Sequence, residues 1–518
     1  MLVVKNMYHF DNFGVTGAST VLLPGYPPSI GLFEIFFNLF SSSFKEGNIY
    51  KGLNILTVSL LMPPLKKYGA DFKGTALRFF VLLAVPMIFF PDAYGDTYVD
   101  CLLGIMFARL IYIGFSEERY DGFFLYNFSI SSAVLVLAKA AGMGLYLFAM
   151  LALAIDIIFF SKKLAADGLN IKNRLIKLIA WTSILIIPFT ANWSWKTYLK
   201  INALNSAWNT SSITVSGILE LFTDKIPEYR VVTIETFTDS YFYMGRFGDI
   251  GFRCSYFLFP VIFTFAMIAA SHMGGNGRRV KYLNFSLFIS YILYTVSLLI
   301  LYLFTYSQRE AESIASFSRY MNTITLGYML AAVIVLLNPA DIHREKSAPE
   351  KNPLLVKKLN FAIVIMAFLL TSVELKDLFL LQARSAEKQR KRAGHIDGLY
   401  GLFDYETDRI YYISQGRTGY EYWQARYALT PVSVNPGDTW SIANDAKDEI
   451  WTIEKTAQEW SDELKADYTY VYIDIIDEQF CMDFGELFED PDNIPERTIY
   501  KIEVTEQNDL VTLVPFWF

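Results

Sequence analysis

The sequence predicts an α-helical polytopic membrane protein with about ten spans, followed by a C-terminal extracytoplasmic α/β domain. Three observations lead to this fold class. Hydrophobic residues make up 53% of the 518 residues and charged residues only 19%, which suits a chain whose main solvent is lipid. Apolar runs long enough to cross a bilayer recur as far as Leu375. Beyond Leu375 the chain becomes polar and acidic, with short β-branched and aromatic runs.

The apolar runs fix the boundaries of the membrane domain, since a span needs roughly 17–25 residues. The predicted spans lie near 52–65, 76–91, 100–116, 122–138, 142–160, 177–193, 252–273, 282–305, 322–338 and 359–375. The predicted domains are a first exterior loop with an interfacial helix (1–50), the transmembrane domain (51–375), a charged connector helix (376–394) and the exterior α/β domain (395–518).

Basic clusters between the spans orient the domain, because short loops rich in lysine and arginine stay in the cytoplasm. Counting spans places four clusters on one side: Lys66, Lys67 and Lys73; Lys162, Lys163, Lys172, Arg174 and Lys177; Arg278, Arg279 and Lys281; Arg344, Lys346, Lys351, Lys357 and Lys358. The exterior then receives 194–250 and everything after Leu375. Residues 1–50 must also be exterior, so this topology implies a further helix upstream of Met1.

Several function classes are excluded by what the sequence carries. The net charge of −7 argues against a nucleic-acid partner, which would need a basic face. The three cysteines and four histidines are scattered, so neither a disulfide framework nor a zinc site is predicted. No cofactor is evident, and no acidic pair with ligand spacing indicates a divalent metal.

Ionisable residues converge on the exterior ends of the spans, where a charge is costly unless it faces a cavity or a partner. They are Lys5 and Asp11 in the opening loop, Asp100 and Arg319 at the starts of spans, and Lys139 in a short turn. Lys139 and Arg319 suit an anionic group such as a lipid phosphate. Alternative interpretations stay open: Lys139 snorkelling to headgroups, an interfacial Arg319, a helix-capping Asp100 and a solvated Asp11.

The opening loop is stiffened by Tyr26-Pro27-Pro28, because each proline fixes its own φ and restricts the residue before it. The segment 29–40 then places Leu32, Phe36, Phe37 and Phe40 on one apolar stripe, as in a helix that lies in the membrane interface. A plain amphipathic connector would give the same pattern.

The C-terminal region reads as strands at 409–414, 468–475, 498–504 and 510–516, with a helix over 455–467. Its aromatic residues suggest either stacking on sugar rings or core packing; those singled out are Tyr420, Tyr422, Trp423 and Trp440.

Segments 2–37, 98–107 (YVDCLLGIMF), 136–144 (VLAKAAGMG) and 315–321 (ASFSRYM), with the region from 409 onward, resemble the polytopic GT-C glycosyltransferases of Gram-positive bacteria. The resemblance implies transfer of a sugar from a polyprenyl-phosphate carrier to a cell-surface glycan at the outer face of the bacterial cytoplasmic membrane. It also implies inversion by direct displacement and a membrane-lipid environment. Lys5, Tyr26, Lys139, Arg319 and Tyr320 match positions that bind the substrates.

The acid expected to act as catalytic base belongs to an Asp-Glu-Phe-Ser-His-Trp-like stretch of the family that would lie upstream of Met1. Asp11 and Asp100 are the weaker candidates within the chain. Two alternatives remain: an inactive truncated homologue, and a transporter or flippase for lipid-linked glycans. The flippase is disfavoured by the absence of a repeated half and by ionisable residues that gather at one face.

Overall fold

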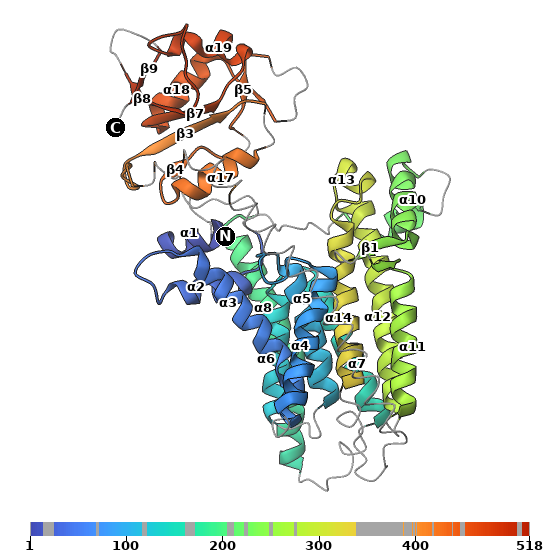
Figure 1. The fold of residues 1–518 in the computed structure, drawn as a ribbon. Coiled ribbons are helices and arrows are strands. Elements are labelled where there is room, and N and C mark those ends of the chain that lie inside the picture. Colours follow the sequence, from blue (N-terminus) through green and yellow to red (C-terminus); the bar gives the residue numbers. More distant parts are fainter. Residues whose placement is uncertain are drawn as a thin grey trace. The chain divides into compact units, whose positions relative to one another are not determined.

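The computed structural model is mostly helical and describes residues 2–13, 25–68, 72–116, 122–160, 171–204, 212–221, 226–247, 252–273, 277–337, 387, 396, 399, 401–416, 419–437, 439–445, 451–504 and 510–516 (Figure 1). Three helices in these ranges are long and apolar enough to cross a membrane: Gly142–Phe159, Arg278–Phe304 and Phe317–Leu337. The predicted tenth span, and all of the predicted connector except Glu387, lie outside these ranges.

The chain divides into two compact units. The first unit comprises Met1–Pro24, Ile35–Glu46 and Leu381–Phe518, so it joins the beginning of the chain to the C-terminal domain. The second unit comprises Gly25–Glu34 and Gly47–Leu380 and holds the helical bundle.

A helix coincides with each of the first nine predicted spans. These helices are α3 (Glu46–Leu61), α4 (Phe72–Phe89), α5 (Val99–Ser116), α6 (Gly122–Val136), α7 (Gly142–Phe160), α8 (Ile171–Ile201), α11 (Leu258–Met273), α12 (Gly277–Phe304) and α14 (Phe317–Leu337). Shorter elements connect them: η2 (Pro63–Tyr68), α9 (Val215–Glu220), α10 (Glu228–Phe242), the antiparallel pair β1 (Gly245–Phe247) and β2 (Phe252–Cys254), and α13 (Gln308–Glu312).

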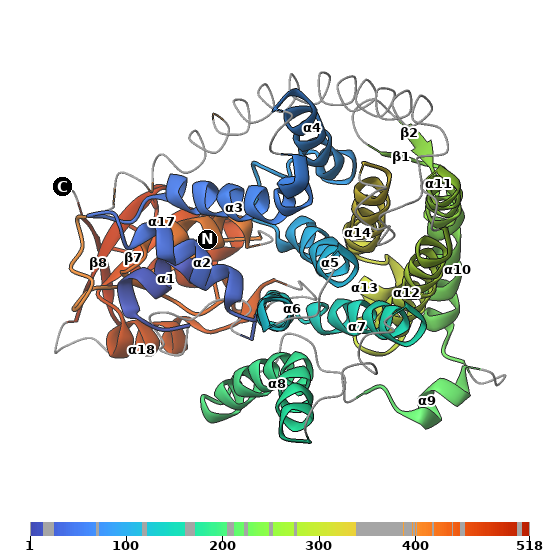
Figure 2. The ribbon, with the colours of Figure 1, turned by 90° about the horizontal axis from the view of Figure 1, so that it is seen from below.

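Helix α5 lies beside α14, α6 and α7 when the bundle is viewed along its axes (Figure 2). Two glycines allow α5 and α14 to approach closely. A Cβ atom at Gly104 would lie 2.7 Å from the carbonyl oxygen of Thr323, and one at Gly327 would lie 2.6 Å from the Phe107 ring. Small residues at a crossing are the usual way in which membrane helices pack backbone to backbone.

A buried ion pair joins α7 to α12. Arg279 donates from Nε and Nη2 to the two carboxylate oxygens of Asp156, at 2.5 and 2.8 Å. Arg279 belongs to a basic cluster predicted between two spans, and only 4% of its side chain is exposed. The sequence could not show this because Asp156 lies 123 residues away, in the middle of an apolar run.

Helix α2 (Ser29–Asn38) and the two residues after it expose part of the predicted apolar stripe, whereas Ile30 is buried and Phe37 half-buried. Glu34 and Asn38 are buried, whereas Leu32, Phe36 and Phe40 are exposed. An apolar face turned outward is expected where the surroundings are lipid, in line with the predicted interfacial helix.

The C-terminal domain is built on a five-stranded sheet in the order β4-β3-β7-β8-β9. Strands β4 (Ser433–Val434), β3 (Arg409–Ser414) and β7 (Tyr470–Ile475) are parallel to one another. Strand β8 (Thr498–Glu503) runs antiparallel to β7, and β9 (Thr512–Pro515) runs antiparallel to β8. The four predicted strands correspond to β3, β7, β8 and β9, and the predicted helix to α18 (Ala457–Asp467).

Helices cover both faces of this sheet. Side chains of α17 (Tyr420–Leu429) join one core cluster, and those of α18 and α19 (Glu478–Phe484) join the cluster on the other face. A short parallel pair, β5 (Ile442–Ala443) and β6 (Ile453–Glu454), and the turn η3 (Gly485–Leu487) complete the domain.

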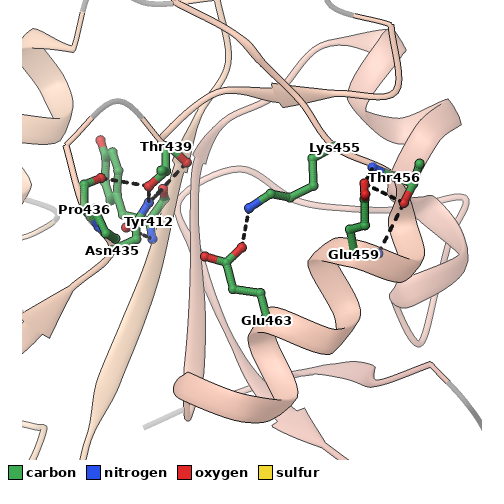
Figure 3. A network of polar contacts seen from close by, with 8 residues as sticks. All are labelled: Tyr412, Asn435, Pro436, Thr439, Lys455, Thr456, Glu459 and Glu463. Carbon is green, nitrogen blue, oxygen red and sulfur yellow. Dashed lines mark hydrogen bonds and ion pairs between the residues drawn. The ribbon is translucent and has the colours of Figure 1, made fainter.

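Polar contacts fix the loops around the sheet (Figure 3). The amide of Asn435 accepts from the Tyr412 backbone N–H at 2.8 Å and donates to the Thr439 hydroxyl at 2.9 Å. On the other side of the domain, Thr456 and Glu459 form a capping box that begins α18. Each bond satisfies a backbone or side-chain group that burial or a helix end would otherwise leave unpaired.

Candidate functional site

Three segments of the bundle bring Asp100, Lys139 and Arg319 together. Asp100 lies in the first turn of α5 and Arg319 in the first turn of α14. Each is one turn from the Gly104–Thr323 approach, so the close packing of the two helices places their first turns side by side. Lys139 lies in the turn between α6 and α7.

The α6–α7 turn depends on Gly142, whose backbone N–H donates to the Lys139 carbonyl at 2.8 Å. A Cβ atom at Gly142 would lie 2.0 Å from the carbonyl oxygen of Leu135, so only glycine fits the tight reversal. The turn fixes the backbone at Lys139 and so aims its side chain toward α5.

Asp100 is the centre of the cluster. Its Oδ1 lies 2.6 Å from Lys139 Nζ, and its Oδ2 lies 3.4 Å from Arg319 Nε. The Lys139 ammonium also lies 4.9 Å from the centre of the Tyr320 ring, and Arg319 lies against the Tyr320 and Tyr98 rings at 5.2 and 5.0 Å. We call Asp100, Lys139, Arg319 and Tyr320 the Asp100 cluster.

The cluster holds two cations against one carboxylate. The side chains of Lys139 and Asp100 are 5% and 4% exposed, whereas that of Arg319 is 32% exposed. The Arg319 Nε is buried and makes no hydrogen bond within the described ranges, because its contact with Asp100 is an ion pair without hydrogen-bond geometry. A buried donor of this kind, with excess positive charge beside it, suits an anion that can accept from a guanidinium fork.

The opening loop of the chain lies against the same turn. Ser29, at the start of α2, donates from its backbone N–H to the Leu137 carbonyl and from its hydroxyl to the Val134 carbonyl, both at 3.0 Å. Tyr26, three residues earlier, lies within electrostatic range of Asp100 and Arg319. Burial raises the pKa of the Tyr26 hydroxyl, and the Asp100 charge raises it further, while Arg319 opposes them.

Asp96 was not among the predicted residues, although it lies in the loop just before α5. Its Oδ1 accepts from the backbone N–H groups of Thr97 and Tyr98, at 2.6 and 3.2 Å. Burial raises the pKa of the Asp96 carboxyl, and Arg319 is close enough to oppose that rise. The only signal in the sequence was the acidic loop 91–99 at the end of a span.

Lys5 and Asp11 belong to the first unit. The Lys5 ammonium donates to the carbonyls of Tyr427 and Ala428, at 2.6 and 3.3 Å, and lies 4.8 Å from the Tyr427 ring centre. It therefore satisfies the last turn of α17, where a cation also complements the helix dipole. Asp11 is exposed at the end of α1 (Leu2–Phe10) with a φ of 51°.

No group of three or more metal-ligating side chains occurs within the described ranges. Comparisons with known protein families, curated proteins and solved structures found no match. The function is therefore argued from the Asp100 cluster itself.

Proposed function

We propose that this protein is a GT-C-type glycosyltransferase of the bacterial cytoplasmic membrane. It moves a sugar from a polyprenyl-phosphate carrier to a cell-surface glycan at the outer face. In this proposal the chain crosses the membrane about ten times, and the cluster and the C-terminal domain both lie on the exterior side.

The Asp100 cluster is the observation that carries this proposal. Its net charge is positive, and Arg319 is partly exposed with an Nε that makes no hydrogen bond to the described residues. Asp100 contacts both cations, so in this proposal it orients them. The tyrosine rings give the cations a semi-apolar wall, which suits a lipid phosphate lying at the membrane boundary.

The proposed reaction is a direct displacement. The acceptor hydroxyl attacks the anomeric carbon of the sugar, and the bond from that carbon to the phosphate oxygen breaks. The leaving polyprenyl phosphate keeps the electron pair, and Arg319 with Lys139 stabilises the charge that develops on it. Attack from the face opposite the phosphate inverts the anomeric configuration.

Asp96 is our candidate within the described ranges for the group that takes the acceptor proton. Its Oδ1 is held by two backbone N–H groups, and in this proposal Oδ2 accepts the proton. Its environment favours the protonated form, and a raised pKa strengthens a carboxylate as a general base.

The test is sugar transfer by the full chain in lipid nanodiscs. Polyprenyl-phosphate carriers of glucose, galactose, mannose and N-acetylglucosamine serve as donors, and a glycan extract of the cell surface serves as acceptor. Label should move from at least one carrier to the glycan, and the Arg319→Ala and Lys139→Ala variants should lose this transfer. Movement of intact carriers across the bilayer without transfer would instead favour a flippase.

A further inference from the structure

A column of stacked aromatic rings runs from the core of the C-terminal domain to its surface. Tyr422 and Trp440 are 0% and 1% exposed, and their ring centres lie 5.1 Å apart with an interplanar angle of 29°. Trp451 lies on the outer side of Trp440, at 6.2 Å and 28°, and is 42% exposed. Tyr422 and Trp440 are therefore core residues, and Trp451 is the member of the column that solvent reaches.

The column is held rigidly by the strand beneath it. The Ser414 backbone N–H donates to the Trp440 carbonyl at 2.8 Å, and the Gln415 amide makes two bonds to the backbone of Ile442. Gly419 has a φ of 84°, and a Cβ atom there would lie 2.6 Å from the Trp440 ring. These contacts fix the Trp440 ring, the surface on which the exposed Trp451 indole stacks.

The position of Trp451 is one at which α/β domains bind ligands. From β3 the chain passes through α17, on one face of the sheet, to β4 on one side of β3. It then passes through α18, on the other face, to β7 on the opposite side of β3. The order of the strands therefore reverses at β3. Ligands of open α/β sheets bind outside the carboxyl ends of the strands at such a reversal. Ser414 and Gln415 end β3 and anchor the column, so Trp451 belongs to this edge.

Trp451 is followed in the chain by the hydroxyl residue Thr452, which contacts the buried Ser441. The Ser441 hydroxyl accepts from the backbone N–H of Gly416 at 3.1 Å and lies 2.9 Å from the hydroxyl of Thr452, the residue that follows Trp451. A flat, exposed aromatic face suits a sugar ring, whose C–H bonds point at the negative π face.

The charge of the domain restricts which sugars fit. Residues 395–518 contain 26 acidic and 8 basic side chains. A ligand that carries phosphates or carboxylates would be repelled by this field, whereas an uncharged glycan would not.

We propose that Trp451 is the stacking platform of a binding site for an uncharged saccharide. The site stands on the geometry of the C-terminal domain alone. Its role, which is to hold the acceptor glycan, rests on the proposed function and narrows the acceptor to a neutral polymer.

Saturation-transfer NMR on the full chain tests the site. Lipid nanodiscs replace sugar-headed detergents, which would compete for the ring. The probes are maltoheptaose and cellohexaose, both uncharged, and an oligogalacturonate as the anionic counterpart. We expect saturation of the sugar C–H protons of at least one neutral probe, roughly tenfold weaker binding after Trp451→Ala, and a smaller loss after Trp451→Phe.

Tyr405→Ala is the matched control, because Tyr405 is an exposed aromatic residue of the same domain that precedes the amino end of β3. Its binding should equal that of the wild type. The site is refuted if neither neutral probe binds, if Trp451→Ala binds as tightly as wild type, or if the anionic probe binds best. Arg319→Ala should leave probe binding intact although it loses transfer, whereas Trp451-dependent binding by a wild-type chain that transfers no sugar in the nanodisc assay would keep the site and reject its acceptor role.

Discussion

The Nζ atom of Lys139 lies 2.6 Å from Oδ1 of Asp100, although 39 residues separate them in the chain. Both side chains are almost fully buried, so each depends on the other for a counter-charge. This pair makes Asp100 a positioning residue for the cations. Substitutions in the pair should therefore change both the free energy of unfolding and the affinity for a phosphate ligand.

Asp100→Asn removes the counter-charge and leaves a buried ammonium. Breaking a buried pair in this way costs about 3–5 kcal/mol, so the free energy of unfolding in mixed micelles should fall by about that amount. The double variant Asp100→Asn with Lys139→Met should recover most of the loss. Equal stability of Asp100→Asn and wild type would show that the pair is not formed.

Asp156→Asn tests whether stability and binding are separable. It breaks the buried pair with Arg279 and should also lower the free energy of unfolding by about 3–5 kcal/mol. Asp156 and Arg279 do not take part in the Asp100 cluster, so affinity for a polyprenyl phosphate should stay unchanged. A parallel loss of affinity would mean that destabilisation alone impairs the site.

Two glycines at the start of α7 provide a matched pair. Gly142→Ala forces a Cβ atom against the Leu135 carbonyl, whereas a Cβ atom at Gly144 meets no described residue within 4 Å. Gly142→Ala should lower the free energy of unfolding by about 1–3 kcal/mol and displace Lys139. Gly144→Ala should be neutral or slightly stabilising. Similar behaviour of the two variants in denaturation and transfer assays would rule out the tight turn.

Asp96→Asn should slow sugar transfer by about 10²–10⁴-fold, because a general base contributes that much. Since burial raises the Asp96 pKa, the active ionised form should be lost as pH falls, at a pH above the ordinary aspartate value of 3.8. The acid limb of the pH–rate profile should disappear in the variant. Asp92→Asn, at an exposed position of the same loop, is the control: it should keep the rate above the acid limb, and because the Asp92 charge raises the Asp96 pKa, its acid limb should persist and move to a slightly lower pH.

The sequence located the helices and three members of the cluster because boundary charges and apolar runs are local features. Asp100, Lys139 and Arg319 stood out as ions at the ends of spans, and the fold brings them together. Lys5 stood out for the same reason, yet its ammonium donates to a carbonyl in the last turn of α17. The sequence could not reveal this, because no local pattern indicates a partner 422 residues away.

The sequence could not predict long-range partners, and it could not predict the exposure of individual side chains either. Trp440 and Trp451 look alike in the sequence, but only the folded domain shows that one is buried beneath the other. Asp96 was missed because a loop acid carries no periodicity, and its proximity to Arg319 arises from the packing of α5 against α14.

The most direct test of the central claim is the affinity of the full chain in nanodiscs for undecaprenyl phosphate. Arg319→Ala and Lys139→Ala should each weaken binding roughly tenfold to a hundredfold, as expected for the loss of a charge-assisted bond to phosphate. Arg309→Ala, at an exposed arginine of α13, should bind like the wild type. Wild-type affinity in both cluster variants would contradict a phosphate site at Asp100, Lys139 and Arg319.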